Sequence, residues 1–105
     1  MLDYTTRDKK VLPVKISEDL TLLLRPPKKN LYEKLAAIED RVNDATDGGT
    51  VYDEIVELTA DILSTNMSRH QFSAAEVEEM FDIEDMAALV YEYAAYAGNI
   101  LKNPN

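Results

Sequence analysis

The fold is decided by residues 72–105, FSAAEVEEMFDIEDMAALVYEYAAYAGNILKNPN, which contain two helix starts. Ser73 and Glu76 have the spacing of a capping box, in which the Ser73 hydroxyl accepts from the Glu76 amide and the Glu76 carboxylate accepts from the Ser73 amide. Asp82 has the position of a second N-cap, and Glu84 and Asp85 add negative charge where the helix dipole favours it. These signals predict a short helix at about 74–81 and a long one at about 83–101.

The long helix carries apolar residues at alternating spacings of three and four. The series is Ile83, Met86, Val90, Tyr93, Ala97 and Ile100. Such an a/d seam is typical of a helix that packs lengthwise against other helices. Which tyrosines face the core stays open at this stage. We expect most of this helix to be core and one flank to contact a partner or another copy. The candidate surface comprises Tyr91, Ala94, Tyr96, Gly98 and Leu101.

Two short extended runs precede the helices. Leu12, Val14 and Ile16 alternate with polar residues or proline, and a second apolar run follows the polar turn 17–19. This pattern predicts a β-hairpin at about 11–24, with Pro13 at an edge position because proline cannot donate to a ladder. Because an isolated hairpin is only marginally stable, we expect it to pack against the helices or a neighbouring subunit.

Two further helices are expected between the hairpin and residue 72. Pro26 and Pro27 favour a helix start with proline in the first position, and the helix at about 27–43 ends before Gly48. Its apolar stripe is Leu31, Leu35, Ile38 and Val42. Thr50 is the expected cap of the next helix, at about 51–63, with the stripe Val51, Ile55, Leu58 and Ile62. The fold class predicted is mainly α, a short hairpin followed by four helices, in one domain of residues 1–105 with a flexible arm at 1–9.

Composition excludes several classes of protein. The chain has 105 residues and no Cys, so disulfides and thiolate zinc sites are impossible and a reducing cytoplasm is the simplest location. No apolar run approaches the length of a membrane span, and the amino terminus lacks the apolar core of a signal peptide. We therefore expect a soluble intracellular protein with no membrane partner.

The charge is divided unevenly along the chain. Residues 1–30 carry seven Lys or Arg and four acids, a net +3, whereas residues 31–105 carry four and sixteen, a net −12, which together give −9. An acidic body repels phosphate backbones, so no nucleic-acid partner is expected. Opposite charges at the two ends permit head-to-tail self-association, although ordinary solvated charge also explains the division.

The sequence contains no convincing catalytic, cofactor or metal site. His70 is the only histidine and has no Cys or carboxylate at metal-ligand spacing, so a loop position in solvent is expected. Asn43, Asp47, Gly48 and Glu54 match four positions of a calcium-binding EF-hand loop, but Ala45 offers no oxygen at its third position. We expect no enzyme activity and no cofactor.

The order of these parts resembles the tail assembly chaperones of long-tailed, siphovirus-type bacteriophages and prophages. The resemblance covers residues 10–105, and its closest letters are residues 72–85, the tyrosine-rich helix and the ending 102–105. It implies a helical, acidic protein of the host cytoplasm that self-associates and coats the hydrophobic tape measure protein during tail assembly. It also implies absence from the mature virion and no enzyme activity. Lys102-Asn103 is compatible with the slippery codons at which this family extends its product by frameshifting.

Two other classes of protein fit the same residues. One is a structural head-to-tail connector subunit of a phage, which also forms rings without catalytic residues. The other is a small acidic regulatory binding protein, such as an antitoxin or a DNA mimic, that holds a toxin or a basic partner.

Overall fold

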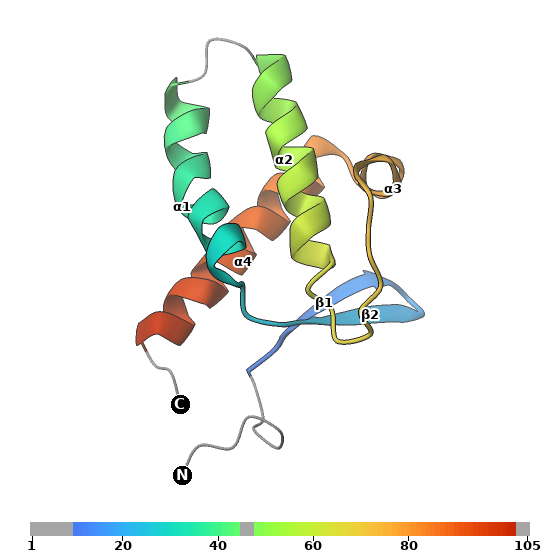
Figure 1. Cartoon of the computed structure of the whole chain (residues 1–105). Coiled ribbons are helices and arrows are strands. Elements are labelled where there is room, and N and C mark those ends of the chain that lie inside the picture. Colours follow the sequence, from blue (N-terminus) through green and yellow to red (C-terminus); the bar gives the residue numbers. More distant parts are fainter. Residues whose placement is uncertain (1–9, 45–47, 103–105) are drawn as a thin grey trace.

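The computed structural model describes residues 10–44 and 48–102, without the side chains of residues 39, 41–44, 48 and 50. Within this part the elements are β1 (Leu12–Ser17), β2 (Leu20–Leu24), α1 (Lys29–Asp44), α2 (Gly48–Leu63), α3 (Ala74–Met80) and α4 (Ile83–Lys102) (Figure 1). The predicted fold class is confirmed: the protein is mainly α, with an antiparallel hairpin before four helices in the described chain. The predicted arm at 1–9 lies outside the described residues.

The hairpin forms as the alternating pattern predicts. Leu12 pairs with Leu24 and Val14 with Leu22, so these side chains share the face that packs on the core, and Pro13 points to solvent. A register shift between Lys15 and Ser17 accommodates the turn. The free side of β2 is extended at one point by a bridge between Leu24 and Asn66, which leaves β1 as the outer strand and places Pro13 at an edge.

Helix α2 is the centre of the fold and contacts the other three helices and β2. Figure 1 shows α1 beside α2, with α4 crossing behind both and the hairpin near the end of α2. Of the predicted stripe, Val51, Leu58 and Ile62 are buried and Ile55 is partly buried against the core. Val56 and Leu63 are buried as well. A helix surrounded by neighbours needs apolar residues on more than one face, which a single-stripe prediction does not capture.

The starts of α1 and α2 differ from the predicted ones. The carbonyl of Lys28 accepts the first helical bond of α1, from the Tyr32 amide at 2.9 Å, so Pro27 precedes the cap and is not the first helical residue. Helix α2 begins at Gly48, so Thr50 lies inside its first turn and is not the cap. The amides in the first turn of a helix have no acceptor within the helix. Gly48 and Gly49 can therefore form the first turn of α2 without any loss of intrahelical hydrogen bonds. In the α1 stripe Leu31 and Leu35 are buried and Ile38 is partly buried against the core, whereas the side chain of Val42 lies outside the described part.

The starts of α3 and α4 are confirmed at both predicted caps. The Ser73 hydroxyl accepts from the Glu76 amide and the Glu76 carboxylate accepts from the Ser73 amide, each at 3.2 Å. The Asp82 carboxylate accepts from the Asp85 amide at 2.8 Å. Two reciprocal caps within ten residues set the sharp change of direction between α3 and α4, so that α4 crosses the rest of the molecule.

Candidate interaction surface

The three tyrosines of α4 point in three directions, which decides the side of this helix that stays open. Tyr93 is fully buried, and its hydroxyl donates to the Arg25 carbonyl oxygen at 2.6 Å. Burial raises the pKa of Tyr93 to about 12. Tyr96 is half-buried against the hairpin, where its hydroxyl donates to the Lys10 carbonyl oxygen at 2.6 Å, and burial raises its pKa as well. Tyr91 is 81% exposed.

An apolar stripe runs along the side of α4 that is most open to solvent, although Ala94 and Gly98 are only partly exposed and Ala94 also packs against the core. It consists of Ile83, Ala87, Tyr91, Ala94, Gly98 and Leu101, spaced four, four, three, four and three residues apart, and is called the α4 stripe below. Tyr91 and Leu101 are its most exposed large side chains, at 81% and 64%. At about 100° per residue, these positions occupy one side of the helix. Four of the five candidate residues, Tyr91, Ala94, Gly98 and Leu101, therefore share a face.

Tyr96 does not share that face. It lies about 140° around the helix from Tyr91 and packs towards the hairpin. The sequence pattern could not separate the two, because both tyrosines lie outside the a/d seam.

The predicted seam is correct in the middle of α4 and wrong at its start. Met86, Val90, Tyr93 and Ala97 are buried, but Ile83 is 41% exposed. A repeat of 3.5 residues drifts by about 20° per heptad around a straight helix of 3.6 residues per turn. This drift is small between Ile83 and the buried Val90, so the exposure of Ile83 follows from its place as the first residue of α4, at the end of the contact with the core.

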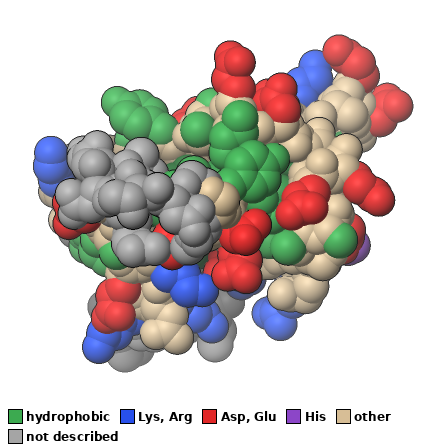
Figure 2. Space-filling model, turned by 90° about the horizontal axis from the view of Figure 1, so that it is seen from above, with side chains coloured by type: hydrophobic (Ala, Val, Ile, Leu, Met, Phe, Trp, Pro, Cys, Tyr) green, Lys and Arg blue, Asp and Glu red, His purple; other side chains and the backbone are tan. Residues whose placement is uncertain are grey.

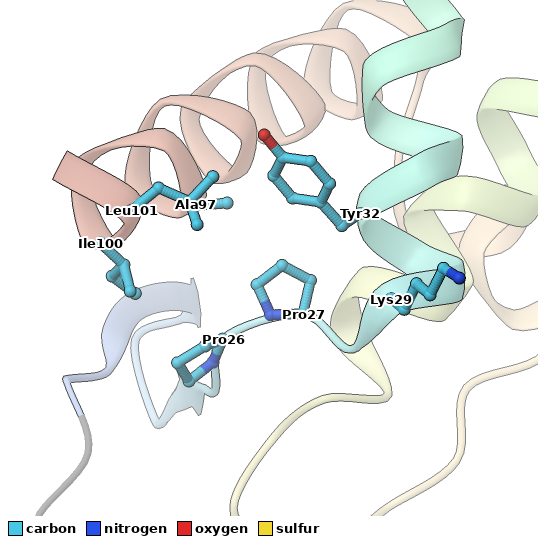
Figure 3. A pocket seen from close by; sticks show the side chains of 7 residues that line it. All are labelled: Pro26, Pro27, Lys29, Tyr32, Ala97, Ile100 and Leu101. Carbon is cyan, nitrogen blue, oxygen red and sulfur yellow. The ribbon is translucent and has the colours of Figure 1, made fainter. Parts of the chain in front are cut away.

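Next to the carboxyl end of the α4 stripe lies an apolar hollow of about 240 Å³. Its walls are Pro26, Pro27, Lys29 and Tyr32 on one side and Ala97, Ile100 and Leu101 on the other (Figure 3). It is called the α1–α4 hollow below. Sequence analysis missed it, because the hollow joins segments about seventy residues apart. One feature of the sequence did indicate that Tyr32 is exposed. Tyr32 follows Leu31 of the buried stripe directly, and successive residues of a helix point about 100° apart.

A further group of exposed apolar side chains lies on the outer face of the hairpin. Leu23 faces Pro13 across the ladder, and its carbonyl oxygen accepts from the Met67 amide at 3.0 Å. Leu23 and Met67 are both exposed. These three residues form a short apolar row next to Lys15 and Thr21.

Acidic and hydrophobic side chains lie side by side on one face of the molecule. Seen from above, hydrophobic side chains at the centre of the molecule have Asp and Glu side chains beside them (Figure 2). Lys34 donates to Asp61 at 2.8 Å between α1 and α2, and this bond raises the pKa of Lys34. Since both partners are partly exposed, the pair contributes little to stability. This ion pair therefore adds little to the packing of α1 on α2.

His70 supports the cap of α3. It is exposed, its Nε2 lies 3.6 Å from Glu76 Oε2, and its ring meets Phe72 edge-on at a centroid distance of 4.5 Å. The Ser73 amide is the main cause that lowers the pKa of Glu76. Among the described residues no three His, Cys, Asp or Glu side chains are grouped so as to hold a metal ion, and the side chains of Asn43 and Asp47 lie outside the described part.

No protein-family model, curated protein or solved structure matches this chain. In the part of the chain that the structure describes, no helix has both the length and the apolar character needed to cross a lipid bilayer.

Proposed function

We propose that this protein is a non-enzymatic phage tail assembly chaperone, which self-associates and keeps the tape measure protein soluble in the host cytoplasm until the tail tube forms. The proposal is carried by one observation: two adjacent apolar surfaces, the α4 stripe and the α1–α4 hollow, are open on a strongly acidic protein. The resemblance of residues 10–105 to tail assembly chaperones gives the class of client.

The α1–α4 hollow is the part that fits the client. A tape measure protein is a long helical chain whose apolar residues aggregate when no tube surrounds them, and the hollow is open and lined mainly by carbon. Pro26 and Pro27 form a wall with little conformational freedom, so a client side chain binds without a large ordering cost. The ring of Tyr32 adds a broad apolar face with a polar tip.

The acidic surface supplies the second property that a holdase needs, which is to keep its complexes with the client in solution. Holding an apolar client lowers its exposed apolar area, and a net charge of −9 makes the complexes repel one another. Neither role requires nucleic acid, a membrane, a metal or a catalytic group.

Co-expression with the tape measure protein tests the proposal. The wild-type chain is expected to keep the client in the soluble fraction and to co-purify with it. Tyr32→Ser is expected to release the client, because it removes one wall of the hollow. Tyr52→Ser is the matched control, since Tyr52 is 38% exposed, Tyr32 is 40% exposed and Tyr52 does not line the hollow. A client that precipitates equally with and without the chain contradicts the proposal.

Mass spectrometry of purified virions separates the chaperone from the connector. A chaperone leaves before the particle is complete, so the chain is expected to be absent. Its presence in stoichiometric amount would favour the connector. Capture of a toxin or a basic DNA-binding protein in place of the client would favour the regulatory binder.

A further inference from the structure

We infer that the α4 stripe binds the α4 stripe of a second copy of this chain, with the two helices antiparallel around a two-fold axis at the level between Glu92 and Tyr93. This inference gives the geometry of the self-association included in the proposed function and rests on that part of it. Three features of α4 support it: the order of large and small residues, the position of charges at its ends, and the space around Gly98.

When two α4 stripes run antiparallel, the large residues of one stripe face small residues of the other in the central part of the contact. In the antiparallel arrangement, Ile83 meets Leu101 of the second copy, and Tyr91 lies over Ala94 of the second copy. Two small residues, Ala87 and Gly98, meet at the intermediate levels. Each wide ring therefore lies over a small side chain, and the large aliphatic side chains close the two ends. A parallel arrangement would place Tyr91 against Tyr91 and Gly98 against Gly98, leaving one crowded level and one gap.

The charges at the ends of α4 select the same direction. Glu84 is in the first turn and Lys102 in the last, and they are eighteen residues apart, or about five turns, so they lie on the same flank of the stripe. In the antiparallel pair, Glu84 lies beside Lys102 of the second copy at both ends of the contact. Within its own chain, neither Glu84 nor Lys102 forms an ion pair with any residue that the structure describes. Antiparallel helix dipoles also attract.

Gly98 has no packing role within its own chain. A Cβ atom at this position would meet nothing within 4 Å, although glycine is a poor helix former and α4 continues to Lys102. Close approach of a second backbone is a physical reason for glycine at a partly exposed helix position. In the antiparallel pair that backbone is the one that carries Ala87.

The contact side and the core side of α4 are separated around the helix. The core side of α4, marked by Met86 and Tyr93, lies about a third of a turn away from Ala87 and Gly98. Two-fold symmetry therefore places the two bodies side by side, with both α1–α4 hollows outside the central part of the contact. The client and the second copy then use neighbouring surfaces, and only Leu101 belongs to both.

Disulfide trapping tests the direction of the helices. The natural chain has no Cys, so every bond formed involves an introduced residue. Oxidation of a mixture of Ala87→Cys chains and Gly98→Cys chains is expected to give several-fold more cross-linked dimer than either variant alone. Ala88→Cys mixed with Ala95→Cys is the matched control, because these exposed residues are at similar levels of α4 but off the stripe. Equal or stronger bonding within each single variant would mean a parallel pair and overturn the inference.

Sedimentation equilibrium gives the second measurement. Tyr91→Glu is expected to raise the dissociation constant of the dimer more than about tenfold, with an unchanged circular dichroism spectrum because Tyr91 is exposed. Lys102→Glu is expected to weaken the dimer, and Glu84→Lys combined with Lys102→Glu to restore it.

A wild-type chain that sediments as a monomer at the concentration of the trapping experiment overturns the inference. If Tyr91→Glu then also loses the client, the client occupies the stripe and the proposed function stands without the dimer. The opposite outcome is a chain that forms the disulfide between positions 87 and 98 but does not retain the tape measure protein. In that case the dimer stands and the proposed function fails.

Discussion

The hydroxyl of Tyr93 donates a hydrogen bond of 2.6 Å to the carbonyl oxygen of Arg25, joining the middle of α4 to the residue directly after β2. This bond crosses 68 positions of the chain and holds the hairpin, α4 and the start of the proline wall in one arrangement. It therefore links the core to the surface on which the proposed function depends.

Tyr93→Phe is expected to lower the free energy of unfolding by about 1–3 kcal/mol, because the Arg25 carbonyl loses its partner in a partly buried place. Urea denaturation measures the change. Tyr91→Phe is the control and is expected to leave stability within about 0.5 kcal/mol at low protein concentration, since Tyr91 is exposed. Equal effects of the two substitutions would contradict the importance of the bond.

Alkaline pH is expected to destabilise the protein through the same residue. Burial raises the pKa of Tyr93 from 10.0 to about 12, so between these values the unfolded chain releases a proton that the folded chain keeps. The free energy of unfolding therefore falls as pH rises from about 10 to about 12. Tyr93→Phe is expected to flatten this slope, leaving the smaller contribution of Tyr96, whose pKa is also raised. An unchanged slope would show that other groups cause the alkaline loss.

Ser73→Ala is expected to cost about 0.5–2 kcal/mol of stability, because it removes the side chain that accepts from the Glu76 amide. Ser73→Thr is expected to restore most of the loss, since the threonine hydroxyl can accept from the Glu76 amide and donate to the Glu76 carboxylate as serine does. Ser68→Ala, in the preceding exposed loop, serves as control. Thermal unfolding followed at 222 nm compares the variants.

Gly98→Ala is expected to have opposite effects on the folded chain and on the dimer. The added Cβ meets nothing within the chain, so better helix propensity raises the stability of the monomer by about 0.5–1 kcal/mol. In the dimer the same methyl group separates two backbones and weakens association. Chemical denaturation at low protein concentration measures the stability of the monomer, and sedimentation at high concentration measures the dissociation constant of the dimer. A variant with both a more stable monomer and a tighter dimer would show that no close contact forms at Gly98.

Asn66→Ala is expected to be among the most damaging polar substitutions, with a loss of about 2–3 kcal/mol. Asn66 is buried; its Nδ2 donates to the carbonyl oxygens of Leu63 and His70, each at 2.8 Å, and its Oδ1 accepts from the His70 amide at 3.1 Å. Removing it leaves three backbone groups without these partners. Asn30→Ala, at an exposed position in α1, is the control, and native-state hydrogen exchange at the His70 amide reports the local effect.

The local features of this fold could be predicted because their causes lie within a few residues of one another. The caps at Ser73 and Asp82 join atoms three positions apart, and the stripe through Leu31 and Leu35 follows from the helical period alone. The starts of α1 and α2 were missed by two or three residues, since the prolines and glycines there fit both the last loop residue and the first helical turn.

The candidate surface could be predicted only in part. Tyr91, Ala94, Gly98 and Leu101 share a face, but Tyr96 packs against the hairpin, and the α1–α4 hollow was not foreseen. The a/d spacing includes Tyr93 in the packing seam, but it does not decide whether the amphipathic Tyr91 and Tyr96 face the hairpin or solvent.

By itself the sequence determined the number, type and order of the elements, the caps that start α3 and α4, and the absence of cysteine chemistry, because each depends on composition or on neighbours along the chain. Only the tertiary structure decided that Tyr96 packs towards the hairpin, that Tyr91 is open and that Pro26, Tyr32 and Ala97 enclose one hollow. These outcomes depend on how α4 crosses α1 and α2, and that crossing is set by the summed packing of side chains far apart in sequence.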